Sequence, residues 1–194
     1  MRLPFYLALA LTISSVAQSQ TVPDDFTGQW WLHQSEDAQI AYIAGDSDCY
    51  AYEVRGHAYP STSLSDQSTN RVTEYLQSHP AEQRLPLVRV FRQIFARDKH
   101  PRPTKKLIGS AEYWPEKHGF FDGDYWRQIA DDGRSSYLAA YLWCEIAFRG
   151  KHLTRPLRYY VRALNRWYGI DKDDNMLGKN GDEKIADVVQ RLLR

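Results

Sequence analysis

The sequence predicts an all-α fold, organised as two tandem helical repeats packed as a pseudo-twofold pair. Three observations lead to this prediction. Apolar residues recur with the 3.6-residue period of an α-helix, and no stretch sustains the two-residue alternation of a strand. Shifting the sequence against itself by 95 positions aligns an aromatic motif and a long helical segment with a second copy of each. The two cysteines fall at equivalent positions of these copies.

Length and composition fit one compact domain or two small ones. The chain has 194 residues, of which 43% are hydrophobic and 25% are charged. Its 25 Lys and Arg nearly balance its 24 Asp and Glu. A dedicated nucleic-acid-binding protein carries an excess of positive charge, so we expect no nucleic-acid partner. Six Trp and thirteen Tyr supply large rings for the core.

The first 17 residues have the pattern of a signal peptide. Arg2 precedes an apolar run over residues 3–13, and Ser15-Val16-Ala17 is a small-x-small cleavage site. The run falls short of the roughly 20 apolar residues that span a bilayer, although an uncleaved membrane anchor is the alternative. The next longest apolar run, residues 136–148, is also too short. We therefore expect a periplasmic or secreted protein that begins near Gln18, with no stable membrane insertion after cleavage.

The internal repeat divides the remaining chain. Seven of 24 aligned positions are identical, and they include Phe26 with Phe121, Gly28 with Gly123, Trp31 with Trp126, Tyr42 with Tyr137, and Cys49 with Cys144. The predicted organisation is helical repeat one over residues 18–96, a basic Pro-containing linker over 97–118, and helical repeat two over 119–194. The alternative is a coincidence between two aromatic-rich helices.

The first long helix of each repeat has one inward stripe. In repeat two the stripe is Tyr137, Tyr141, Cys144 and Phe148, and in repeat one it is Tyr42, Gly45, Cys49 and Tyr52. Asp37 and Asp132 fall in the first turns, where a carboxylate faces the positive end of the helix dipole. Arg55-Gly56 and Arg149-Gly150 are typical of helix C-termini.

Small and large side chains on these helices have different predicted roles. Ala44, Gly45, Ala139 and Ala140 would let a second helix approach closely. The large rings Trp31, Tyr42, Trp126 and Tyr137 are the predicted core of the two repeats.

Further helices complete each half. Residues 69–76 are followed by a break at 78–80, and Leu87, Val90, Phe91 and Ile94 then form a helical stripe. Residues 156–168 form one helix in the second half, and Ile185, Val188, Val189 and Leu192 repeat the stripe. Each half is therefore predicted as helix, helix, break, helix.

Cys49 and Cys144 are candidates for a disulfide. Both lie on inward stripes, and an exported protein resides where disulfides persist. If equivalent helices face each other across a pseudo-twofold axis, the two sulfurs meet. Two separate buried thiols are the alternative.

Motifs for catalysis are absent from the sequence, and we predict no catalytic residue. The six histidines are dispersed, without zinc or haem spacing. Glu53 and Glu145 follow the cysteines and have the residue type of paired acids for glycoside cleavage, but solvated positions at the helix edge are the expectation.

One segment has the spacing of a calcium loop. Asp171, Asp173, Asn175 and Asp182 occupy positions 1, 3, 5 and 12 of a twelve-residue loop, but Met176 stands where such a loop needs Gly. A flexible acidic loop is the alternative, and we expect no cofactor other than this candidate calcium.

Two motifs carry a family resemblance. Tyr42-Ile43-Ala44-Gly45 lies on a first helix, and Tyr75-Leu76 followed by His79-Pro80 leads into an apolar helix. Over residues 36–96 the chain resembles the Rap/Tai family of periplasmic immunity proteins. The resemblance implies a small exported all-α domain, dimeric in that family, which binds and blocks a cell-wall-cleaving effector delivered by type VI secretion.

We therefore expect a non-enzymatic exported helical protein that binds a protein partner, with immunity-like inhibition of a cell-wall-targeting effector as the form that the resemblance implies. An envelope structural or stress protein without a defined ligand is one alternative. A cell-wall-acting enzyme is the other, and it would need a cleft with perturbed carboxylates.

Overall fold

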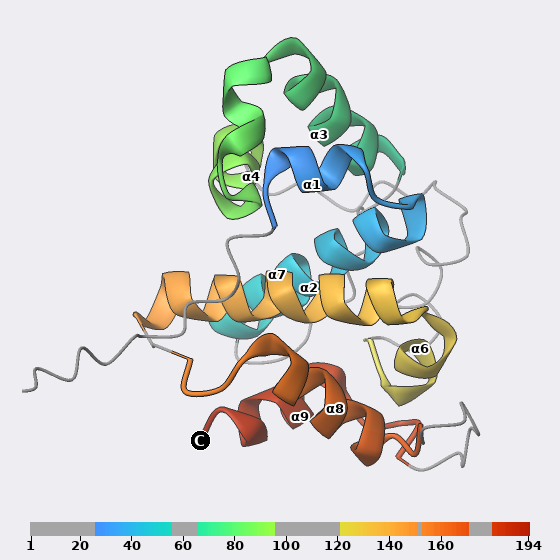
Figure 1. The fold of residues 1–194 in the computed structure, drawn as a ribbon. Helices are drawn as coiled ribbons and strands as arrows, with labels where there is room; N and C mark the ends of the chain where they lie inside the picture. Colours follow the sequence, from blue (N-terminus) through green and yellow to red (C-terminus); the bar gives the residue numbers. More distant parts are fainter. Residues whose placement is uncertain (1–25, 56–65, 96–120, 151–152, 171–179) are drawn as a thin grey trace, which may run out of the picture.

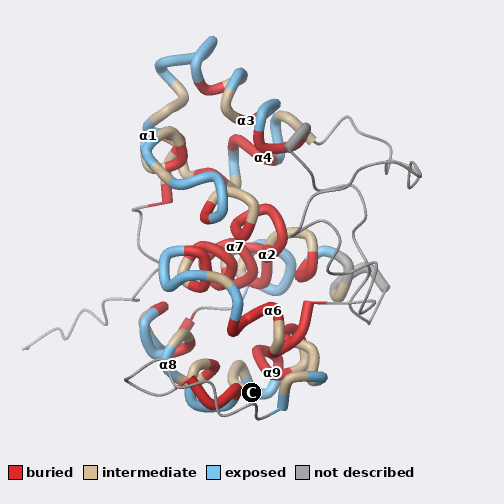
Figure 2. The backbone as a smooth tube through the Cα atoms, turned by 90° about the vertical axis from the view of Figure 1, so that its right-hand side faces the viewer, coloured by how far each residue is buried: buried red, intermediate tan, exposed pale blue. Residues whose placement is uncertain are grey.

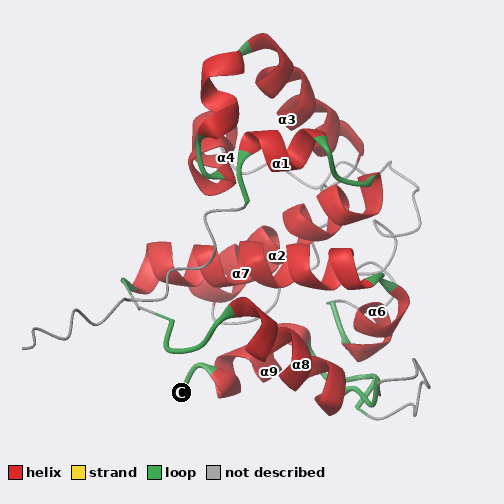
Figure 3. Ribbon diagram, viewed as in Figure 1, coloured by secondary structure: helices red, strands yellow, loops and turns green. Residues whose placement is uncertain are grey.

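The computed structural model describes residues 26–55, 66–95, 121–150, 153–170 and 180–194. The predicted signal peptide and linker lie outside these ranges. Within them the chain forms eight α-helices, one short 3-10 helix and no strand, so the all-α prediction is confirmed (Figure 3). The α-helices are α1 (Gly28–Leu32), α2 (Glu36–Arg55), α3 (Asp66–Ser78), α4 (Leu87–Phe95), α6 (Gly123–Gln128), α7 (Asp131–Arg149), α8 (Leu157–Trp167) and α9 (Ile185–Leu192), and the 3-10 helix is η1 (Pro80–Arg84).

Helices α2 and α7 lie together in the middle of the molecule. Helices α1, α3 and α4 cover one side of this pair, and α6, α8 and α9 cover the other (Figure 1). The central pair is the most continuously buried part of the fold (Figure 2). At the beginning of the pair the Ser35 hydroxyl donates a hydrogen bond to Asp132, and further along both helices the disulfide joins Cys49 to Cys144. Because residue numbers rise together along both helices, α2 and α7 run parallel.

A glycine sets how closely the two central helices approach. A Cβ atom on Gly45 would lie 2.0 Å from the carbonyl oxygen of Tyr137 on α7, a distance that no side chain tolerates. The predicted role of this small residue in close helix approach is therefore confirmed. One turn further on, the predicted Cys49–Cys144 disulfide is present, with its Cα atoms 6.2 Å apart.

Short helices with capped N-termini lead into the central pair. The Thr27 hydroxyl accepts a hydrogen bond from the Trp30 backbone N–H at 3.2 Å, and Asp122 accepts one from the Tyr125 N–H at 2.9 Å. These side chains satisfy N–H groups that the first turn of a helix leaves without a partner. Backbone hydrogen bonds connect the residue before each of these N-termini to a later helix. The Leu87 N–H donates to the carbonyl of Phe26 at 2.9 Å, and the Ile185 N–H donates to the carbonyl of Phe121 at 3.0 Å.

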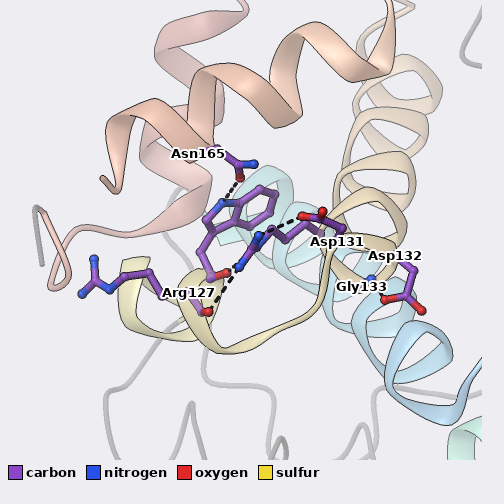
Figure 4. Close-up of polar contacts among 7 residues, drawn as sticks. Arg127, Asp131, Asp132, Gly133 and Asn165 are labelled. Carbon is purple, nitrogen blue, oxygen red and sulfur yellow. Dashed lines mark hydrogen bonds and ion pairs between the residues drawn. The ribbon is translucent and has the colours of Figure 1, made fainter. Parts of the chain in front are cut away.

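Two fully buried tryptophans anchor the outer helices to the centre. The indole N–H of Trp31 donates to the Thr73 hydroxyl on α3 at 3.0 Å. The indole N–H of Trp126 donates to the side-chain oxygen of Asn165 on α8 at 2.9 Å (Figure 4). A buried indole requires such an acceptor, so these bonds fix α3 and α8 against the rings.

The corner between α6 and α7 is held by the buried guanidinium of Arg134. Its Nε donates to the Trp126 carbonyl at 2.9 Å, and its terminal nitrogens bond the Arg127 carbonyl and the Asp131 carboxylate (Figure 4). At the corresponding corner of the first half, Gln39 donates to the Trp31 carbonyl at 2.8 Å. Both side chains satisfy carbonyls that end a short helix.

The last turn of α7 departs from the predicted inward stripe. Tyr137, Tyr141 and Cys144 are buried, whereas Phe148 is 50% exposed and its ring contacts Tyr50 at 5.7 Å. The stripe ends at the disulfide because the helix continues past the layers that cover it. Gly150 then takes the left-handed conformation, with φ of 62°, as predicted for the C-terminus of this helix.

Candidate binding site on helix α8

Helix α8 has one face in the core and one in solvent. It begins after Pro156, whose ring suits a helix start, and ends at Trp167 before Gly169, which has φ of 75°. Leu157, Tyr160 and Leu164 are buried against the rest of the second half. The amphipathic pattern therefore fixes which side chains of α8 point outward.

The outward face carries a stripe of three exposed arginines. Arg158, Arg162 and Arg166 stand at i, i+4 and i+8, so they recur about every 6 Å along the helix axis. We call these three residues the arginine stripe. From residue 150 to residue 170 the sequence contains no Asp or Glu. The stripe thus forms a local positive surface on a chain whose formal net charge is only +1.

No carboxylate in the described ranges forms an ion pair with any arginine of the stripe. Four other arginines of the described ranges do form ion pairs: Arg127 pairs with Asp124, Arg134 with Asp131, Arg149 with Glu145 and Arg191 with Glu183. The stripe is therefore available to an anionic group from outside the described fold.

A groove between α7 and α8 adjoins the stripe. Its volume is about 420 Å³. It is lined by Ser135, Pro156, Leu157, Arg158, Val161 and Arg162. Pro156, Leu157 and Val161 give it apolar walls, and the two arginines add positive charge. Such a groove can receive an apolar side chain while the guanidinium groups bind nearby carboxylates.

Exposed aromatic rings lie at both ends of α8. Tyr159 is 44% exposed, with the guanidinium of Arg155 at 5.5 Å from its ring centre. Trp167 is 41% exposed, with Arg191 at 4.8 Å from its ring. Tyr, Trp and Arg are the residue types that dominate binding energy at protein interfaces, so this composition is typical of a docking surface.

A second groove lies between α3 and α4, also about 420 Å³ in volume. It contains Tyr75, part of the motif that carries the family resemblance, and the Tyr75 ring stacks on His79 at 4.2 Å. The Tyr75 hydroxyl donates to Glu82 at 2.8 Å, and the His79 ring bonds the Tyr75 carbonyl at 2.9 Å. The polar groups of Tyr75 and His79 bond to other parts of the fold. This groove therefore presents fewer polar groups to a binding partner than the arginine stripe does.

The structure places the predicted site residues in different environments. Trp31, Tyr42, Trp126 and Tyr137 lie in the core, each no more than 1% exposed. Asp171, Asp173 and Asn175 of the candidate calcium loop lie outside the described residues, whereas Asp182 is exposed. Within the described ranges, no group of three or more His, Cys, Asp or Glu is arranged to hold a metal ion.

Glu145 corrects one prediction. We expected a solvated residue, but Glu145 is 1% exposed and accepts a hydrogen bond from Gln190 on α9. Its other carboxylate oxygen lies 3.3 Å from Nε of Arg149. The sequence pattern missed this because α9, distant along the chain, covers the helix edge that α7 alone would expose. The side chain of Glu53 lies outside the described part of the structure.

A buried carboxyl group that the sequence did not indicate lies beside the disulfide. Asp48 is 1% exposed, and the Tyr137 hydroxyl donates to its Oδ2, while its Oδ1 has no partner among the described residues. Burial raises the pKa of Asp48 to about 7 from 3.8, and the Tyr137 hydrogen bond opposes this shift. Compared with the unfolded chain, the folded state therefore favours the neutral acid. Neither of the two grooves described above is lined by Asp48 or Glu145.

Helices of the described ranges include none that is long and apolar enough to cross a membrane. Comparison of the chain with protein-family models, with curated proteins and with solved structures finds no match.

Proposed function

We propose that this chain is an exported, non-enzymatic helical protein whose function is to bind a protein partner. The observation that carries the proposal is the arginine stripe beside the apolar groove of α8. Arginines without an ion pair in the described part of the chain, exposed aromatic rings and a concave apolar surface are together the composition of a protein-binding site. The proposed periplasmic or secreted location rests on the signal-peptide pattern of residues 1–17.

We further propose that the chain consists of two tandem helical repeats related by a pseudo-twofold axis along α2 and α7. Several contacts in the first half have a counterpart in the second. The hydrogen bond from Trp31 to Thr73 corresponds to that from Trp126 to Asn165, and the bond from Gln39 to the Trp31 carbonyl corresponds to that from Arg134 to Trp126. The disulfide joins residues 95 positions apart, the same shift that aligns the sequence with itself.

This proposal supplies an internal comparison for the arginine stripe. If Thr73 corresponds to Asn165, then α3 corresponds to α8, and Asp66, Asn70 and Glu74 stand where α8 has its three arginines. The same structural position accepts acidic, neutral and basic residues, so the fold does not require arginine there. Arginine on α8 is better explained by binding. A purely structural envelope protein, the alternative, gives no reason for the stripe.

The family resemblance gives the proposal a specific form. On the Rap/Tai likeness of residues 36–96, the bound partner is a cell-wall-cleaving effector, and binding inhibits it. The described motif residues Tyr75 and His79 stabilise the turn between α3 and η1 through their stacked rings. We therefore place partner binding on α8 and assign these motif residues a structural role.

Site-specific photo-cross-linking in exporting cells tests the proposed function. A photoreactive phenylalanine analogue replaces Val161 in the groove, and in a matched control it replaces Gln128, an exposed residue outside both grooves. We expect the first variant alone to form a discrete cross-linked species, whose partner is identified by mass spectrometry. Equal cross-linking at both positions, or none at Val161, would contradict the proposal.

A further inference from the structure

We infer that the partner presents an acidic amphipathic helix, which lies along α8 with its carboxylates on the arginine stripe and an apolar side chain in the groove. This inference rests on the proposed protein-binding function and adds the chemistry of the partner. Three features of the molecule support this partner: the spacing of the charges, the position of the groove, and the orientation of α8 in the fold.

The spacing of the stripe suits a helical partner. Arg158, Arg162 and Arg166 lie one above another, about 6 Å apart along the axis. Carboxylates at i, i+4 and i+8 of another helix have the same spacing. Two helices that pack side by side can thus form several arginine–carboxylate pairs at once, each able to adopt the bidentate geometry that arginine favours.

The groove adds an apolar anchor beside the charges. Leu157 and Val161 contribute walls next to Arg158 and Arg162, so an apolar residue flanked by acidic ones satisfies both features. Ion pairs at an exposed surface contribute little on their own. The apolar contact excludes water from the centre, and the charged rim then determines which partner binds.

The orientation of α8 favours a protein over a lipid surface. Basic amphipathic helices bind membranes by inserting their apolar face between lipids. In this fold the apolar face of α8 is used in the core, where Leu157, Tyr160 and Leu164 are buried. The outward face has three arginines beside an open groove, so charged side chains interrupt its exposed apolar groups.

Binding of a synthetic helical peptide to the full mature protein tests the inference. The peptide carries Glu at i, i+4 and i+8 with Leu on the same face, and fluorescence anisotropy measures its dissociation constant. Arg158→Glu with Arg162→Glu should weaken binding roughly 10-fold to 100-fold. A peptide with Lys in place of Glu should instead prefer that double variant, a reversal that a general loss of folding cannot produce.

Matched controls separate the local surface from net charge. Arg84→Glu with Arg89→Glu changes the net charge equally at exposed positions of the first half, and it should leave peptide binding unchanged. Circular dichroism verifies that both double variants are folded. Vesicles of anionic phospholipid are offered in parallel, and tighter binding to vesicles than to the Glu peptide would overturn the inference.

The two proposals fail in different ways. Cross-linking at Val161 without measurable affinity for the acidic peptide would refute the acidic helix and leave protein binding intact. Equal loss of peptide binding in both double variants would also refute the inference, because the effect would then come from net charge. Absence of both cross-linking and peptide binding would overturn the two proposals together.

Discussion

Replacement of Gly45 by alanine tests the packing of the central helix pair. The substitution adds one methyl group to α2 at the point where it crosses α7. That methyl would lie 2.0 Å from the Tyr137 carbonyl oxygen, 2.8 Å from its carbonyl carbon and 3.0 Å from its Cα. All three atoms belong to the backbone, so no side-chain rotation can relieve the contact.

The expected cost follows from the displacement that the methyl requires. Carbon atoms at Cβ positions are essentially never closer than 3.0 Å to another heavy atom, so the two helices must separate by about 1 Å. The disulfide one turn away limits this movement. Overpacking of a rigid core costs up to about 3 kcal/mol, and alanine recovers about 1 kcal/mol of helix propensity. We expect a net loss of about 2 kcal/mol.

Gly133 on α7 supplies the control. A Cβ there would meet the Cβ atoms of Ile129 at 3.4 Å and Ala41 at 3.7 Å, which are ordinary contact distances. Gly133→Ala should therefore leave stability unchanged or raise it by up to about 1 kcal/mol. Urea unfolding of the oxidised proteins, followed by circular dichroism, gives both free energies. If Gly45→Ala were as stable as Gly133→Ala, the close backbone contact would be wrong.

Three further predictions concern the core. Cys49→Ser with Cys144→Ser should lower the free energy of unfolding by about 4 to 5 kcal/mol, because the disulfide closes a loop between residues separated by 95. Urea unfolding measures this loss, and reductant should lower the stability of the parent protein only. Trp31→Ala, which removes a fully buried ring, should lower the free energy of unfolding by about 3 to 5 kcal/mol. Trp167→Ala removes a ring that is 41% exposed, and it should lower the free energy of unfolding by about 1 kcal/mol or less. Thermal unfolding resolves this difference. Burial raises the pKa of Asp48 from 3.8 to about 7, so the free energy of unfolding should fall as pH rises through this range. Asp48→Asn removes the ionisable group, and it should stabilise the fold by at most about 4 kcal/mol at pH 8 but add little at pH 3. Urea unfolding at the two pH values measures this difference.

Local signals in the sequence were sufficient for much of the fold. The helical period of α7, the left-handed Gly150 and the pairing of Cys49 with Cys144 could all be predicted from residue spacing and residue type. Glu145 and Asp48 could not. Their burial depends on helices that pack against them from other parts of the chain, and a polar residue on a helix gives no sign of such a neighbour.

The candidate site also combines features that the sequence shows with features that depend on the tertiary structure. The absence of acids from residues 150–170 and the i, i+4 spacing of the arginines were visible in the sequence. What the sequence did not show was that these arginines have no ion-pair partner within the described fold. A charged stripe on a helix is most often a solvated or paired surface, so its significance depends on which carboxylates the tertiary structure brings near it.

The central pair explains why a binding surface can develop on one outer helix without loss of the fold. Gly45, the disulfide and the buried rings fix α2 against α7 through contacts that do not involve the outward face of α8. That face contributes no described ion pair to the fold, so replacing its arginines removes none of those contacts. The charge of α8 and the stability of the core should consequently vary independently, and additivity between Arg162→Glu and Gly45→Ala in urea unfolding measures this directly. A coupling energy above about 0.5 kcal/mol would mean that the stripe takes part in folding and would weaken its assignment to binding.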